Sequence, residues 1–198
     1  MALAGSRNKM ALAKKGAFQQ RCIDFFSCVY GLYERGLKIM RRKDREVTDI
    51  EMILGFVSRA KFLHLGLFDG KYPYVVPLHY GYEYAEGVLV FFMHCAKEGH
   101  KLDLIRENSN VCIELECDVS DISGGEIPCK YGSTYASVIG QGRAEIVREE
   151  QEKIKGLKLL MENQTGRRFE IDGNMAATVE VIKVVLSDFT AKARQKSN

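Results

Sequence analysis

The sequence predicts a mainly β protein, folded as a small closed or split antiparallel barrel. Six segments have the length and apolar pattern of β-strands, and short turns join the first three of them. Only three segments show helical periodicity. The order along the chain is helix, three strands, helix, two strands, helix and strand, whereas a parallel sheet needs strands and helices in alternation. A barrel with few helices is therefore the expected architecture.

The first 39 residues differ in composition from the rest of the chain. Ala, Gly and Lys alternate there without a clear period, and a stretch rich in Phe, Tyr, Arg and Lys comes next. We expect residues 1–39 to be an extension outside the core, with an amphipathic helix, a surface anchor and a poorly ordered segment as the alternatives. Residues 40–198 are expected to form the split-barrel domain, and Met40 is a candidate translation start.

The first helix of the domain is expected after Thr48, the predicted N-cap. Glu51 follows three residues later and completes a capping box. Apolar residues then recur at helical spacing to about residue 60. The cap and the apolar face together predict an amphipathic helix.

Three strands are expected next, over residues 62–68, 74–80 and 88–94. An Asp-Gly pair at 69–70 is a hairpin-turn signal, and a Glu-Gly pair at 86–87 marks a second turn. Connections this short make the three strands antiparallel neighbours.

The second half of the domain contains the remaining three strands and two helices. Gly166 is the predicted stop of the last helix. Glu114 and Glu116 share one face of their strand by alternation and are expected to face solvent, and His64 is expected to be structural. The elements are expected in this order: helix 101–107, strand 111–117, long loop 118–132, strand 134–147, helix 149–162 and strand 177–189.

Charge and composition exclude several classes of protein. The net charge of +3 is too small to indicate nucleic-acid binding. No apolar run reaches the ~18–20 residues of a membrane-spanning helix. No secretory signal is evident, so we expect the six cysteines to be reduced and the protein to be cytoplasmic. Neither a C-x-x-C nor an H-E-x-x-H pattern occurs, so no metal site is expected.

The segment FFMHCAKEGHKLDLIREN, residues 91–108, predicts an anion site. It reads as a strand that ends in His94, a loop through Gly99, and a helix that opens on His100 and Lys101. Free backbone N–H groups and the positive end of the helix dipole favour a phosphate at such a helix start. A basic side chain adds a charge-assisted hydrogen bond. The pattern therefore indicates a phosphorylated ligand.

Four segments in order also carry a family resemblance: YPYVVPLHYGY, FFMHCAKEGHKLDLIREN, STYASVIGQGRAEIV and DFTAKA. With them, residues 40–192 resemble the pyridoxamine 5′-phosphate oxidase-like FMN-binding split barrels, in the branch that contains the nitroimidazole-resistance proteins. The resemblance implies a six-stranded split barrel and a homodimer. It also implies one FMN in each of two sites along the dimer interface.

The resemblance also assigns the cofactor-binding residues. It gives the FMN phosphate to His100 and Lys101, where the family commonly has Arg or Lys at the first position. A histidine is only fractionally charged near neutral pH, so phosphate binding at His100 is expected to be weaker or pH-dependent. The other FMN-contacting positions implied by the family are Val76, Pro77, Leu78, Phe92, Met93, His94, Ser137 and Lys192, the last reaching the partner subunit's flavin.

The function implied is that of an FMN-dependent oxidoreductase that reduces a small-molecule substrate such as a nitroaromatic. His94 occupies the position of an active-site histidine in the nitroimidazole-resistance branch; the alternative is a partly buried histidine bonded to the backbone. Two other functions stay open: a non-catalytic flavin carrier, sensor or redox partner, and a relative that binds haem or a deazaflavin.

Overall fold

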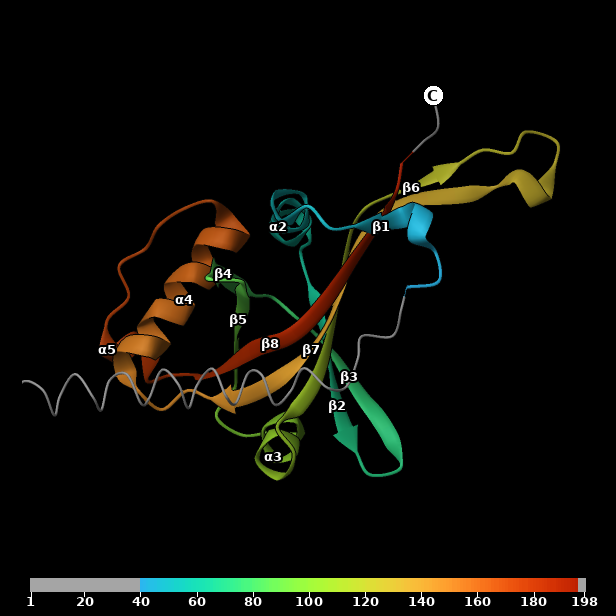
Figure 1. Ribbon diagram of the computed structural model, residues 1–198. Coiled ribbons are helices and arrows are strands. Elements are labelled where there is room, and N and C mark those ends of the chain that lie inside the picture. The colour runs from blue at the N-terminus through green and yellow to red at the C-terminus, as the bar shows by residue number, and fades with distance from the viewer. Residues whose placement is uncertain (1–39, 196–198) are drawn as a thin grey trace, which may run out of the picture. The chain divides into compact units, whose positions relative to one another are not determined.

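The computed structural model of the protein describes residues 40–195 (Figure 1). Strands in this part of the chain form one antiparallel sheet in the order β3-β2-β6-β7-β8-β5-β4, and β1 pairs with β8. The strands are β1 (Glu46–Val47), β2 (Leu63–Asp69), β3 (Tyr72–Leu78), β4 (Gly81–Ala85), β5 (Val88–Cys95), β6 (Asn110–Ile122), β7 (Gly132–Ile146) and β8 (Glu180–Arg194).

The two edge strands, β3 and β4, approach each other because they are consecutive in the chain. Only His79 and Tyr80 separate β3 from β4, so the sheet must curl until its edge strands approach each other there. No hydrogen-bonded ladder joins β3 to β4 within the described residues, so the barrel is split rather than closed. The predicted class, a mainly β antiparallel split barrel, is confirmed. The prediction for residues 1–39 lies outside the described residues.

The strand count differs from the predicted six. The expected strand over 74–80 ends at Leu78, because Tyr80 turns inward and is fully buried. Its hydroxyl donates to the carbonyl oxygen of Val57 at 2.5 Å, with the carbonyl oxygen of Ala60 3.1 Å away, and burial raises the pKa of this phenol. The chain then starts a new strand, β4. The other addition is β1, which is too short to show a period.

The three predicted helices of the domain are present, with one correction at the first cap, and a short helix over residues 173–176 was not predicted. Asp49, not Thr48, is the N-cap of the first helix, and its carboxylate accepts a hydrogen bond from Met52 N at 2.8 Å. Both residue types cap helices well, so the sequence does not distinguish them. No helix within residues 40–195 is long and apolar enough to cross a membrane. The helices are α2 (Ile50–Arg59), α3 (His100–Glu107), α4 (Glu150–Thr165) and α5 (Gly173–Ala176), with short 3₁₀ turns η1 (Lys43–Arg45) and η2 (Pro128–Lys130).

The expected long loop over 118–132 is wrong in its extent. β6 continues to Ile122 and β7 begins at Gly132, so only residues 123–131 lie outside strands, at the tip of a hairpin arm that projects from the barrel (Figure 1). The register shifts between Cys117 and Ser120, where Asp118 has a left-handed φ of 57°. The Arg59 guanidinium binds the Asp118 carboxylate at 2.7 Å and lowers its pKa. Arg59 of α2 thus binds the bulged residue Asp118, and β6 and β7 stay paired on both sides of the bulge.

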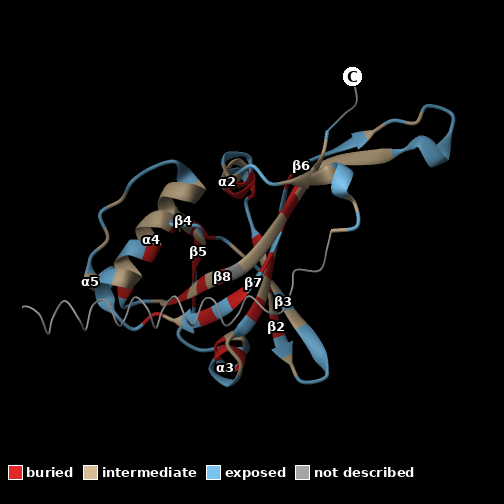
Figure 2. Ribbon diagram, in the orientation of Figure 1, coloured by how far each residue is buried: buried red, intermediate tan, exposed pale blue. Residues whose placement is uncertain are grey.

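Two apolar clusters hold the domain together (Figure 2). The larger one fills the barrel and includes the fully buried Phe91, Met93 and Leu102. Helices α2 and α3 both contribute to it, and in Figure 1 they lie at opposite ends of the barrel. The smaller cluster lies between α4 and the outer side of β5 and β8, around Phe92 and Val181. Alternate residues of β5 thus serve different clusters.

Candidate functional site

The start of α3 carries the residues predicted to hold a phosphate. Gly99 is the N-cap with φ 141°, a conformation that favours glycine, and no side chain caps the helix. Leu102 N donates to Gly99 O at 2.8 Å, so the first turn is closed. The N–H groups of His100 and Lys101 are left without a side-chain partner in the described residues. This helix start therefore offers backbone donors and the positive end of the dipole.

The two basic side chains at this helix start have different surroundings. His100 Nε2 lies 2.8 Å from Asp69 Oδ2, and its ring meets the Tyr74 ring edge-on at 5.0 Å. Lys101 is half-buried and makes no ion pair or hydrogen bond within residues 40–195. Burial raises the pKa of the Cys95 thiol, and the positive charge of Lys101 offsets part of that rise. In the described part of the chain, Lys101 is thus the unpaired cation at the start of α3, whereas His100 already has a carboxylate partner.

The three predicted residues of β5 point in different directions. The Phe92 side chain packs beneath α4, Met93 points into the barrel, and both are buried. His94 is exposed near the strand end, and its side chain has no hydrogen-bond partner among the described residues. β4 begins at Gly81, opposite Phe92, so the backbone beyond that point is paired on one side only, by β8. An open strand edge therefore leads toward α3.

The predicted residues of β3 lie on an edge strand. Val76 and Leu78 pair with core residues of β2 and pack against the main apolar cluster. Pro77 alternates to the outside, where it lines a hollow of about 700 Å³ together with His64 and Glu116. Because β3 ends the strand path, one side of its backbone has no strand partner in the described residues. Only alternate residues of an antiparallel edge strand turn their backbone groups to the open side, and Pro77 has no N–H, so this edge offers a ligand only part of these backbone groups.

Ser137 and Lys192 are brought together, but far from α3. They are register partners on β7 and β8, and Ser137 is 7% exposed. Lys192 Nζ lies 5.8 Å from the centre of the Tyr135 ring. Lys192 also pairs with Glu46 of β1, and in Figure 1 β1 and α3 lie at opposite ends of the sheet. Within a single chain the predicted residues therefore lie in separate groups.

Sequence reasoning missed one cluster and one partner. His64, expected to be structural, meets Glu114 and Glu116, which were expected to face solvent. Alternation placed the two glutamates on one face, but the histidine comes from a strand 50 residues earlier in the chain. Asp69, expected only as a turn residue, is the partner of His100. No local sequence signal indicates either contact.

Comparison with known proteins identifies the family. The family model described as pyridoxamine 5′-phosphate oxidase matches residues 49–193, most of the chain. The chain belongs to the pyridoxamine 5′-phosphate oxidase family. The matched range covers the site residues at β3, β5, α3 and β7, and also Lys192. No curated protein matches this family member.

Solved structures with the same fold include flavin- and haem-binding proteins. This pyridoxamine 5′-phosphate oxidase family member is 26% identical to a candidate 5-nitroimidazole antibiotic resistance protein from Bacteroides thetaiotaomicron, with a TM-score of 0.64 over 75% of this chain and 86% of that one. A flavocytochrome from Azotobacter vinelandii has 17% identity and a TM-score of 0.64, over 80% and 73% of the two chains. An FAD- and haem-binding protein from Mycobacterium smegmatis has 14% identity and a TM-score of 0.62, over 77% and 74%. The last two show the fold alone.

Proposed function

We propose that this family member is an FMN-binding flavoprotein that acts as an oxidoreductase on a small acceptor such as a nitroaromatic. One observation carries the proposal: α3 starts without a side-chain cap, and Lys101 in its first turn has no ion-pair or hydrogen-bond partner in the described residues. Family membership supports the flavin, and the 26% identical nitroimidazole-resistance candidate supports the substrate class.

The residues at α3 fit a phosphate group. Gly99 leaves room for an anion, since a Cβ built there meets no atom within 4 Å. The N–H groups of His100 and Lys101 and the Lys101 ammonium are the donors that a phosphate needs. The Asp69 carboxylate opposes such binding, because it holds His100 and carries a negative charge of its own. Lys101 is therefore the principal phosphate ligand in this proposal.

The ring and ribityl chain of FMN would be held by backbone groups. Alternate residues on the unpaired edges of β3 at Val76–Leu78 and of β5 at Met93 and His94 offer backbone groups, of which Pro77 can supply only a carbonyl acceptor. Ser137 and Lys192 lie at the other end of the sheet, so they are assigned to the flavin held by the partner of a homodimer. A complete site then needs two chains.

An exposed apolar face supports the homodimer. Phe68 and Val75 are 63% and 56% exposed, and Ile139 is 42% exposed. Between them, Gly66 and Cys112 pair across β2 and β6 and line an apolar hollow of about 410 Å³. Large apolar side chains this exposed mark interaction surfaces when they gather on one face. Light scattering is expected to give twice the 22.4 kDa chain mass.

The chemistry divides between cofactor and protein. FMN, when bound, supplies electron or hydride transfer, and the protein supplies position and protons. His94 is the proton donor or substrate-orienting group, because its ring is exposed and has no partner in the described residues. His94 lies on β5, the strand that is predicted to run beside the flavin.

Asp69→Asn is expected to tighten FMN binding, since the change removes a negative charge beside the phosphate and weakens the hold on His100. The exposed setting limits the effect to about 1 kcal/mol, or about five-fold in Kd. Fluorescence titration with FMN measures it. Asp121→Asn, an exposed change in the hairpin arm, is the charge-matched control and should leave the Kd unchanged.

The function itself is tested by denaturing the purified protein and identifying the released chromophore. FMN is expected, and a haem or deazaflavin would overturn the cofactor assignment. Reduction of a nitroaromatic panel with NADH and NADPH then tests the oxidoreductase. A flavin-loaded protein that reduces none of them would favour a non-catalytic flavin carrier.

A further inference from the structure

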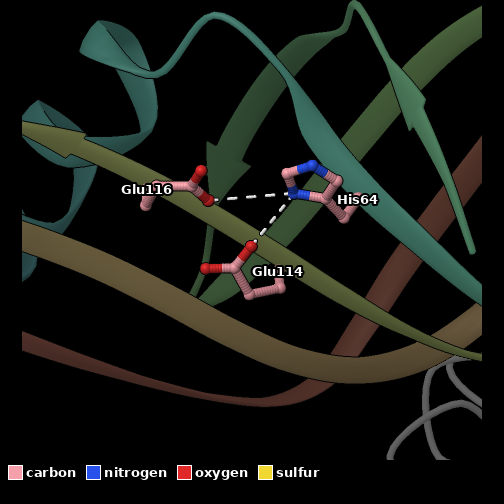
Figure 3. Close-up of side chains that lie close together, drawn as sticks. All are labelled: His64, Glu114 and Glu116. Atoms are coloured by element: carbon pink, nitrogen blue, oxygen red, sulfur yellow. Dashed lines mark hydrogen bonds and ion pairs between the residues drawn. The ribbon is translucent and has the colours of Figure 1, made fainter.

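A histidine and two glutamates meet on the outer face of the barrel (Figure 3). His64 on β2 and Glu114 on β6 are register partners, and Glu116 lies two residues further along the same face of β6. His64 Nδ1 is 3.1 Å from Glu114 Oε2 and 3.7 Å from Glu116 Oε2. In Figure 3 both carboxylates point toward the imidazole. Three groups able to bind a metal thus converge from two paired strands.

The spacing of these atoms suits a transition-metal ion. One ligand atom from each residue lies within 4.8 Å of the other two. Ligands bound to Zn²⁺ at ~2.0–2.2 Å in tetrahedral geometry are about 3.3 Å apart, and the two measured distances fall on either side of this value. Small side-chain rotations would therefore complete the geometry, while the fourth position stays open to water.

The charge of the cluster is unbalanced. No lysine or arginine within residues 40–195 forms an ion pair with Glu114 or Glu116; their ion-pair partner there is His64, and the two carboxylates also lie against each other. Their side chains are 36% and 44% exposed, so water solvates them incompletely. Burial, and then the neighbouring Glu116, raise the pKa of Glu114. A divalent cation would neutralise this pair.

The surroundings hold the three groups in place. His64 and Glu114 line the apolar hollow beside Val75, and His64 and Glu116 line the larger hollow beside Pro77. The ladders β3–β2 and β2–β6 fix the backbone beneath them. Ligands carried on paired strands lose little freedom when they bind an ion, so the site is preorganised.

We propose that His64, Glu114 and Glu116 form a site for a divalent transition-metal ion, of which Zn²⁺ is the probe. The imidazole nitrogen favours Zn²⁺ over Mg²⁺ and Ca²⁺, which prefer oxygen ligands. The ion links β2 to β6 on the face that also carries Pro77. The site lies on the face assigned above to the homodimer, because His64 and Glu114 line the same apolar hollow, but the proposal depends on neither the flavin nor the reaction.

Calorimetric titration of the chelator-treated, full-length protein with Zn²⁺ tests the site. We expect saturable binding of one ion per chain. His64→Gln and Glu114→Gln should each weaken it by at least about 10-fold. Zn²⁺ should raise the melting temperature of the wild-type protein and should not raise that of either variant. Circular dichroism without metal shows whether the variants fold.

Matched controls separate this site from other zinc-binding groups. His79→Gln removes a histidine that instead bonds to Lys61 O and Gln164, and Cys112→Ser removes the nearby thiol. Both should retain wild-type Zn²⁺ affinity. Absence of saturable binding, equal binding by the His64 variant, or equal competition by Mg²⁺ would each overturn the assignment. Flavin content measured on the same samples keeps this result separate from the test of the cofactor.

Discussion

Lys101→Ala is expected to weaken FMN binding by about 10- to 100-fold, the worth of a hydrogen bond to a charged group. Lys101 is half-buried, makes no contact with an acidic side chain in the described residues, and opens a helix that no side chain caps. Its loss removes the unpaired cation of the proposed phosphate site, because His100 is already bound to Asp69. FMN retained per chain after dialysis and the Kd from fluorescence titration measure the effect.

Riboflavin supplies the internal control for this prediction, because it lacks the phosphate. Lys101→Ala should leave riboflavin affinity unchanged and so abolish most of the preference for FMN. Lys97→Ala makes the same change of charge at an exposed residue of the loop before α3 and should bind FMN as the wild type does. An equal loss of FMN and riboflavin in the Lys101 variant would show that the lysine does not act on the phosphate.

Gly81→Ala is expected to destabilise the fold by about 3 kcal/mol, at the upper end of overpacking effects. A Cβ at this position would lie 2.2 Å from the backbone nitrogen of Leu160 in α4. No rotamer change relieves an overlap with backbone, so α4 must move away from β4. Such a shift also disturbs the cluster around Phe92, which α4 covers. Urea unfolding gives the change in free energy as a lower midpoint with a similar slope.

Gly55→Ala is the matched control for Gly81→Ala. It introduces the same methyl group in α2, where the nearest atom to a new Cβ is the flexible end of Arg59 at 3.2 Å. Alanine also favours a helix over glycine by up to about 1 kcal/mol, so this variant should be as stable as the wild type or more so. If both variants unfold at the wild-type urea concentration, α4 does not pack closely on β4.

Local elements were predictable because their signals are local. The Asp-Gly and Glu-Gly turns occur where expected, with Gly70 and Gly87 at positive φ, and Gly166 ends α4 in the left-handed conformation. Apolar alternation predicted most of the strands within a few residues. The strand ends that were predicted wrongly depend on residues that are distant in the sequence. β6 and β7 lengthen because they pair with each other, and the strand over 74–80 breaks because Tyr80 bonds to the end of α2.

The candidate site also has one part that the sequence predicts and another that depends on the tertiary structure. Gly99, His100 and Lys101 are adjacent in the chain, so the sequence by itself determined a helix start with basic side chains and no cap. Only the tertiary structure gave His100 to Asp69 and left Lys101 unpaired among the described residues. It alone brought His64 to Glu114 across the β2–β6 ladder, because strand pairing joins residues that no short-range pattern relates. Periodicity shows which face a side chain takes, and folding decides what it meets there.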